Sequence, residues 1–210
     1  DQDKKEIIAK GSAYLCKHQF SHEVEFGLES IFSDKRYKIS AFRSLLKNQI
    51  FYNPTSFANE NYDPSIHQGI ELEYDKKISD ELQFSSNSTF INSYVTKGTF
   101  KGNETPYIPR IRANANLEYQ ITKSANASVA YKYFGKTRSA NDDNYTLVKS
   151  KSYQVSDVKL SYKVKNFKIN TFVNNILDEK YYTNLIKGGA GAYVYPQAGR
   201  TFGLELEAEF

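Results

Sequence analysis

Tight turns and long connections alternate along this chain at a repeat of about 44 residues, and this regularity limits the fold more than any other feature. Short polar turns are centred near residues 34, 78, 122 and 165, and each separates two segments in which apolar and polar residues alternate. A period of two is typical of strands with one apolar and one polar face. The pattern therefore predicts antiparallel hairpins, with every tight turn at one end of the sheet and every long loop at the other.

The last eleven residues, RTFGLELEAEF, show the alternation most clearly. Their polar face carries three carboxylates, and their apolar face runs to the final residue of the printed sequence. The apolar positions are Phe202, Leu204, Leu206, Ala208 and Phe210, and the acidic ones are Glu205, Glu207 and Glu209.

Counting back through the repeat gives nine strands between residues 20 and 210, with residues 1–19 as a polar loop. The long connections are expected near residues 47–64, 96–109, 134–152 and 176–199. No apolar run approaches the roughly 18 residues of a membrane-spanning helix. The sequence therefore predicts an all-β antiparallel protein.

Strand length and aromatic content favour a transmembrane β-barrel. Strands of about ten residues tilted in a bilayer span its apolar layer, and tyrosines near strand ends suit the aromatic girdles of such barrels. The chain has 17 Tyr and 14 Phe but no Trp. The candidate girdle residues are Tyr37, Tyr74, Tyr119, Tyr133 and Tyr162.

Two soluble folds compete with the membrane barrel. A soluble barrel or sandwich would turn the apolar face inward, and a β-propeller would have more and shorter strands in each repeat with even turns. In a membrane barrel the polar face lines a wet lumen instead. Single-chain bacterial barrels have an even number of strands, and a membrane tolerates no open sheet edge, so nine strands cannot form a complete barrel and we expect further strands N-terminal to residue 1.

Several motifs resemble those of TonB-dependent outer-membrane receptors. The C-terminal signature is similar in residues 174–182 (NNILDEKYY), in Tyr195 and Pro196, and in residues 199–202 (GRTF). Residues 22–30 (HEVEFGLES), 66–73 (IHQGIELE) and 105–109 (TPYIP) resemble three upstream segments of the family, in the family's order. The signature residues are Asn174, Asn175, Asp178, Tyr181, Pro196 and Arg200.

The resemblance implies that residues 1–210 are the C-terminal part of a barrel of about 22 strands. Its turns would be periplasmic and its loops extracellular. It also implies outer-membrane lipid, the TonB complex and a scarce ligand, most often a ferric siderophore, as partners, with a plug domain and TonB box upstream of this segment. Phe202, Leu204, Leu206 and Phe210 would belong to the signal that the outer-membrane assembly machinery reads, so deleting Phe210 should reduce insertion.

Aromatic and basic residues in the long loops are candidate ligand contacts, because exposed rings and cations suit an anionic, aromatic chelate. These candidates are Tyr52, Tyr62, Arg138 and Tyr193. The same residues would suit haem, cobalamin or a copper complex. A porin without a plug, or a structural barrel, is the alternative from another class.

Other chemistry is weakly supported. Cys16 and His22 would lie about 20 Å apart along an extended chain, too far for one metal ion even with His18 between them, so no metal site and no cofactor are expected. The glycine-rich segment 188–191 (GGAG) lacks the Lys-Ser/Thr of a phosphate loop. An outer-membrane enzyme would need a nucleophile and base, and no spacing here indicates one. Scattered charges, 28 basic against 24 acidic, make nucleic acid an unexpected partner.

Overall fold

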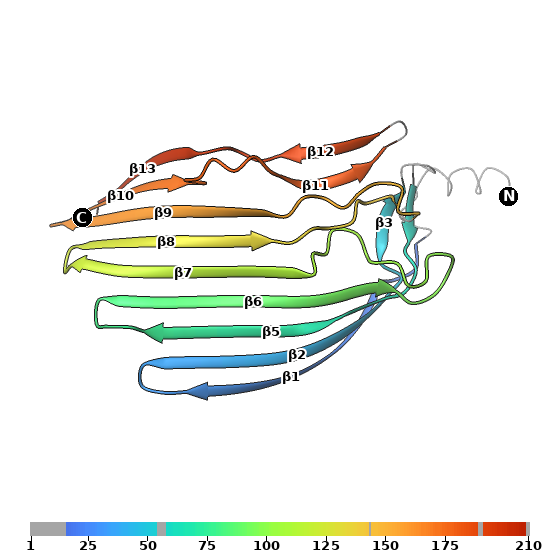
Figure 1. The fold of residues 1–210 in the computed structure, drawn as a ribbon, viewed down its shortest axis with the longest axis horizontal. Helices are drawn as coiled ribbons and strands as arrows, with labels where there is room; N and C mark the ends of the chain where they lie inside the picture. Colours follow the sequence, from blue (N-terminus) through green and yellow to red (C-terminus); the bar gives the residue numbers. More distant parts are fainter. Residues whose placement is uncertain (1–15, 54–57, 143, 189–190, 209–210) are drawn as a thin grey trace.

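A computed structural model describes residues 16–53, 58–142, 144–188 and 191–208, and its main feature is a single nine-stranded sheet. The strand order is β1-β2-β5-β6-β7-β8-β9-β10-β13, so each strand pairs with the next long strand of the chain (Figure 1). Every pairing is antiparallel. The strands are β1 (Phe20–Ile31), β2 (Lys35–Lys47), β5 (Ser65–Lys77), β6 (Leu82–Val95), β7 (Ile111–Thr122), β8 (Ala125–Phe134), β9 (Tyr153–Val164), β10 (Phe167–Asn174) and β13 (Thr201–Ala208).

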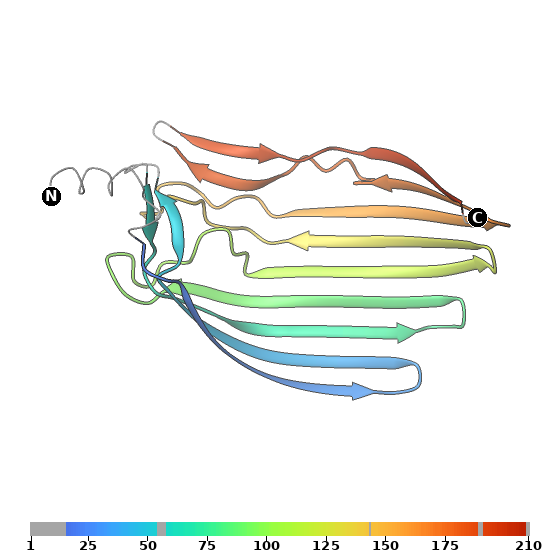
Figure 2. The same ribbon diagram turned by 180° about the vertical axis from the view of Figure 1, so that it is seen from behind.

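The two ends of this sheet differ, as the repeat predicts. At the turn end, connections 32–34, 78–81, 123–124 and 165–166 are short. At the loop end lie connections 48–64, 96–110, 135–152 and 175–200, which we name loops A, B, C and D. Figure 2 shows the same curved single layer from behind, with the turns at one side and the loops at the other.

Loops A and D each contain a two-stranded ribbon that the sequence did not predict. Loop A forms β3 (Ile50–Asn53) and β4 (Ala58–Asn61), and loop D forms β11 (Tyr182–Lys187) and β12 (Ala192–Pro196). The β3–β4 ribbon runs across the direction of the long strands, whereas β11–β12 continues along it (Figure 1). Both ribbons are short and lack a repeated alternation, so the period-two signal did not reveal them.

Strand pairing aligns the side chains into one apolar and one polar face, because directly opposed residues point to the same side. One apolar row contains Phe26, Ala41, Ile70, Phe90 and Ile111 in consecutive strands. The rings of Tyr37 and Tyr74 stack 4.9 Å apart in another apolar row. The expected faces of the long strands are therefore observed.

On the polar face, Arg36 joins three strands. Its guanidinium lies 2.9 Å from Glu29 of β1 and 2.8 Å from both Glu73 and Asp75 of β5. Near the other edge, Asn170 donates hydrogen bonds to Glu205 and Glu207, and Lys168 pairs with Glu207 at 3.2 Å. The carboxylates of the last strand therefore pair within the wall of the sheet.

The buried apolar side chains show that the sheet has no core beneath it. Among the described residues they are Val95, Val155 and Leu185, and all three lie toward the loop end. In contrast, Phe202, Leu204 and Leu206 are 76%, 66% and 68% exposed. A soluble barrel or sandwich would bury this face, so the structure disfavours that alternative. None of the described residues forms a helix long and apolar enough to cross a membrane.

The strand boundaries differ slightly from those expected. Strands β2 and β8 extend through Lys47 and Phe134, where the long connections were expected to begin, whereas β9 begins at Tyr153, directly after the expected connection. Residues 16–19 precede β1 without strand structure. Most of the expected N-terminal loop, residues 1–15, lies outside the described residues, as do Glu209 and Phe210.

Candidate functional site

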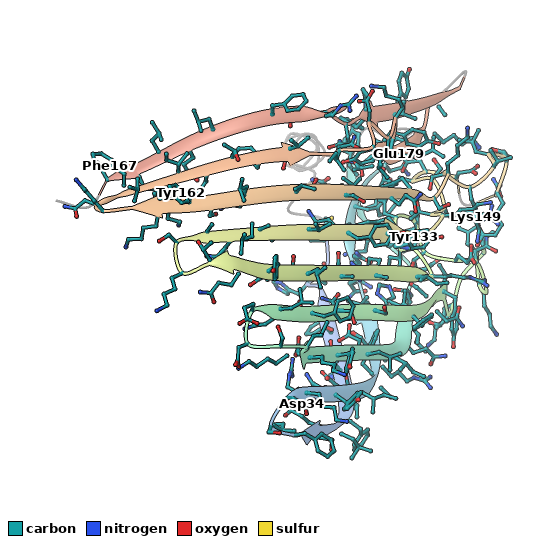
Figure 3. All side chains as sticks on the ribbon, turned by 60° about the vertical axis from the view of Figure 1, so that its left-hand side comes forward. Asp34, Tyr133, Lys149, Tyr162, Phe167 and Glu179 are labelled. Carbon is teal, nitrogen blue, oxygen red and sulfur yellow. The ribbon has the colours of Figure 1, made fainter. Side chains whose placement is uncertain are left out.

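The four long loops gather at one end of the sheet and enclose a cavity of about 560 Å³. Figure 3 shows the dense side chains at this end, near the labelled Lys149 and Glu179, against the sparser turn end near Asp34 and Phe167. Each loop contributes to the wall, together with one residue from the polar face of β5. The lining residues are Gln49, Phe51, Tyr52, Tyr62, His67, Thr105, Pro106, Tyr107, Ile108, Ala140, Asn141, Ile186, Lys187, Gly188 and Tyr193.

Aromatic rings dominate this wall, and local contacts fix several of them. Phe51 and Tyr62 meet edge to face with ring centroids 5.2 Å apart. The ring of Tyr193 lies against Gly188, where an added Cβ would come within 2.0 Å of it, so any larger residue there would displace the ring. Tyr107 adopts a positive φ of 62° and its amide donates to the Arg138 carbonyl at 3.2 Å. Burial raises the pKa of the Tyr107 hydroxyl, so it remains a neutral hydrogen-bonding group.

Glu104 holds loops B and C together. Its carboxylate pairs with Arg110 at 2.5 Å, Lys149 at 2.6 Å and Arg138 at 3.2 Å, and its side chain is 19% exposed. The Arg138 guanidinium also lies 3.7 Å from the ring centre of Tyr145, whose hydroxyl accepts a hydrogen bond from the Glu104 amide. Burial raises the pKa of the Glu104 carboxyl, but the ion pairs with Lys149 and Arg110 outweigh it and hold the pKa below its usual value. We call this group the Glu104 cluster.

Loops C and D are joined by backbone pairing and by Asp142. Ala140 forms a parallel bridge with Ile186, in which the Ala140 amide donates to Leu185 and the Lys187 amide donates to Ala140. The buried Asp142 carboxylate accepts from the amides of Thr146 and Leu147, both at 2.8 Å, and pairs with Lys187 at 3.3 Å. Burial raises the pKa of Asp142, but these hydrogen bonds hold it below its usual value.

The signature residues close the base of loop D. The Asn175 side chain is buried, donates to the carbonyls of Glu179 and Ala198 and accepts from the Glu179 amide. Asp178 accepts from the Arg200 amide at 2.8 Å. These hydrogen bonds between side chains and the backbone hold the start and end of the loop together. We call this arrangement the Asn175 junction.

A second group of rings lies below the junction on the polar face. Phe134, Tyr153 and Tyr181 form a stack with centroid separations of 5.1 and 4.4 Å. Tyr181 comes from loop D, so the stack attaches the base of that loop to β8 and β9. This gives one signature residue a packing role.

The predicted ligand contacts divide into two groups. Tyr52, Tyr62 and Tyr193 line the cavity, whereas Arg138 lies outside its wall in the Glu104 cluster. Sequence reasoning did not single out Phe51 and Tyr107 as contacts. Tyr107 stands within the TPYIP motif, and Phe51 is adjacent to Tyr52 in the sequence, which are the signals that could have indicated them.

The candidate metal residues are not brought together. The Cys16 thiol donates to the Asn59 carbonyl at 3.2 Å, and the His18 carbonyl accepts from Asn48 at 3.1 Å. Among the described ranges, no three His, Cys, Asp or Glu side chains are placed to share a metal ion. Cys16 instead helps to attach the segment before β1 to the β3–β4 ribbon.

The family described as "TonB dependent receptor-like, beta-barrel" matches residues 17–176. The chain belongs to this family. As a TonB-dependent receptor segment, it is part of a multi-pass β-barrel of the outer membrane, and its fold agrees with that class.

Named relatives and solved structures support this membership. The chain is 26% identical to the ferric enterobactin receptor of Pseudomonas aeruginosa, over 76% of this chain and 23% of that protein. It is also 26% identical to the probable TonB-dependent siderophore receptor PiuA of Acinetobacter baumannii, over 89% of this chain and 26% of that one. The ferric yersiniabactin uptake receptor FyuA from Yersinia pestis has a similar structure, with a TM-score of 0.79, 22% identity and coverage of 91% and 30%.

This TonB-dependent receptor segment spans about a quarter of the length of these sequence relatives. A copper transporter, OprC, also shares the fold, with a TM-score of 0.76 and 18% identity over 95% of this chain and 32% of that one. The reported relatives are receptors or transporters by name. Because receptors named for different cargo share it, the fold alone does not identify the ligand.

Proposed function

We propose that this segment belongs to a receptor that binds a ferric siderophore, or a similar small metal chelate, and imports it with energy transmitted by TonB. In this arrangement the turns face the periplasm, the loops face the exterior and the apolar face of the sheet contacts outer-membrane lipid. A plug and a TonB-binding segment would lie in the part of the receptor that precedes this chain.

The loop-end cavity is the observation that carries the proposal. Its volume of about 560 Å³ falls within the range of small-molecule sites, and its wall combines several rings with few polar groups. Stacked rings suit the aromatic parts of a chelate. Arg138 and Lys149 lie outside the wall and pair with Glu104, and Lys187 lines the wall but pairs with Asp142. We therefore assign recognition mainly to the rings and to His67.

The whole receptor should be tested for uptake of radiolabelled iron from a panel of ferric chelates, with haem, cobalamin and a copper complex as competing cargo. We expect Tyr107→Ala with Tyr193→Ala to weaken binding of the accepted chelate about tenfold or more, because each buried aromatic contact contributes roughly 1 kcal/mol beyond its area. Val148→Ala, at an 86% exposed position of loop C, is the control.

A plugless porin makes a different prediction. Its flux would not depend on TonB, would not saturate with chelate and would not change when the cavity rings are removed. Saturable import of haem, cobalamin or copper instead of iron chelate would keep the receptor but replace the cargo. If Val148→Ala lost as much uptake as the double tyrosine variant, the cavity would not be the binding site.

A further inference from the structure

The apolar face carries a cluster of rings and lysines at the turn end, far from the loop cavity. Phe32 follows β1, and Tyr37, Tyr74 and Phe84 lie on the adjoining strands. Their rings form a chain of contacts, with centroids 6.4, 4.9 and 6.1 Å apart in the order Phe32–Tyr37–Tyr74–Phe84. We call this group, with Lys35 and Lys76, the rim cluster.

Two lysines stand directly opposite each other within the rim cluster. Lys35 of β2 pairs in register with Lys76 of β5, and Lys76 pairs with Phe84 of β6. The Lys35 ammonium lies 5.1 Å from the ring centre of Phe32 and 5.9 Å from that of Tyr37. Side chains directly opposite in an antiparallel pair have Cβ atoms about 5 Å apart, so both ammonium groups can reach one anion.

Lys35 contacts the rings of Phe32 and Tyr37, but the pair has no carboxylate partner among the described residues, and the adjacent Asp34 forms no ion pair with either lysine. Neither Lys35 nor Lys76 forms an ion pair with any residue that the structure describes, although both are half-buried. The nearby acidic residue Asp75 points to the polar face, where it binds Arg36. Opposed like charges destabilise a strand pair, and an external anion would remove that cost.

The position of the rim cluster on the apolar face indicates which kind of anion would bind the two lysines. Ile39 and Leu72 continue the same face from the cluster toward the loop end, and they are 47% and 40% exposed. An apolar stripe that ends in rings and cations matches the order of acyl chains, interface and headgroup in a lipid leaflet. Strands added beside β1 would extend the sheet sideways and leave this face uncovered.

We propose that the rim cluster binds an anionic phospholipid of the periplasmic leaflet. Lys35 and Lys76 would hold the headgroup phosphate, Tyr37 and Tyr74 would lie at the interface, and the acyl chains would follow Ile39 and Leu72. This inference rests on the membrane orientation given in the proposed function.

The test is native mass spectrometry of the whole receptor with phosphatidylglycerol or zwitterionic phosphatidylcholine as the probe. We expect the wild type to retain phosphatidylglycerol preferentially and Lys35→Gln with Lys76→Gln to weaken that retention about 25-fold, since each lysine near a lipid surface contributes roughly a factor of five. Lys35→Arg with Lys76→Arg keeps the charge and should keep the lipid.

A matched control lies on the opposite face at the same end. Lys163 and Lys168 are also directly paired, but on the polar face beside Glu207. Their double change to Gln removes the same charge and should leave lipid retention unchanged. Equal loss in both double variants, equal retention of both lipids by the wild type, or preference for lipopolysaccharide would overturn the site.

Orientation is checked separately with a nitroxide at Leu204→Cys in a Cys16→Ser background. Accessibility to oxygen dissolved in the bilayer supports the lipid-facing assignment of the apolar face. If the label is accessible to oxygen but the Lys35→Gln and Lys76→Gln variant retains phosphatidylglycerol as the wild type does, only the phospholipid site is contradicted. A label that is accessible only to water would contradict the lipid-facing orientation of the apolar face, on which both the phospholipid site and the proposed function depend. If the double glutamine variant does not fold, phosphatidylglycerol retention is compared between the double arginine variant and single Lys76→Gln instead.

Discussion

The sheet and the loop layer of this receptor segment are stabilised in different ways. In the sheet, each long strand bonds to its chain neighbours through a long antiparallel ladder and leaves most of its large apolar side chains exposed. In the loop layer, short segments far apart in sequence are joined by carboxylates and by a few hydrogen bonds to the backbone, such as the one that the Ser139 hydroxyl donates to the Leu185 carbonyl. The sheet therefore depends on backbone fit, and the loop layer depends on individual polar groups.

The largest expected effect is in the sheet, at Gly69. An added Cβ would lie 2.1 Å from the Phe90 carbonyl oxygen and 3.0 Å from the Phe42 ring, and the backbone of the paired strand cannot move away cheaply. Gly69→Ala should cost about 3 kcal/mol, at the upper end of overpacking costs. Denaturant titration of the receptor folded in vesicles measures the change.

Gly27→Ala is the matched control on the same face. Its Cβ would be 3.5 Å from the Ser40 Cβ, an ordinary contact, so its unfolding midpoint should stay near that of the wild type. Equal destabilisation by the two alanines would show that loss of chain flexibility, and not the close approach at Gly69, determines the cost.

A smaller effect is expected in the loop layer, at Asp142. Asp142→Ala leaves the Thr146 and Leu147 amides and Lys187 without their acceptor, and losing such charged hydrogen bonds costs about 2 kcal/mol. Hydrogen exchange at these amides should accelerate about 30-fold, while exchange in β5 and β6 stays unchanged. If amide exchange accelerated throughout the long strands as well, the loop layer and the sheet would not be stabilised independently.

The Glu104 cluster should respond to acid. Because its folded pKa lies below the ordinary value, Glu104 contributes stability that is fully present above the unfolded pKa of about 4.3 and is lost as pH falls through the folded pKa. Exchange of the Thr105 amide should therefore accelerate in this acidic window by a few-fold. Glu104→Gln should exchange faster at neutral pH and show a flatter pH profile, and an unchanged profile would assign the acid response to another group.

The smallest effect is expected at the turn end. Lys77 and Asp80 form an ion pair at 2.6 Å, but their side chains are 49% and 87% exposed, and exposed pairs of this kind contribute little. Lys77→Ala should leave the unfolding midpoint and loop exchange unchanged. A clear destabilisation would mean that the turns, and not only the ladder, hold the hairpins together.

The sheet was predictable from sequence because its signal repeats. Residues such as Leu204 and Glu205 take opposite faces by the same rule in every strand, so the nine long strands, their faces and the positions of the turns agree with the expectation. The family motifs indicated the class independently, and the family match confirmed it.

The loop layer was less predictable because its contacts have no period. Nothing in the sequence indicates that Ala140 pairs with Ile186 or that Glu104 gathers three cations. Arg138 was a reasonable candidate contact as an isolated loop cation, but its neighbours in space give it another partner. Tyr52, Tyr62 and Tyr193 share a cavity only because loops A and D meet there.

The Asn175 junction has a mechanical consequence. Because the Asn175 side chain binds the carbonyls of both Glu179 and Ala198, the two ends of loop D are tied together at the base of the β11–β12 ribbon. A force applied to this ribbon when a cargo molecule binds or leaves would act first on the Asn175 junction. The junction would therefore protect the hydrogen bonds between β10 and β13 from being broken.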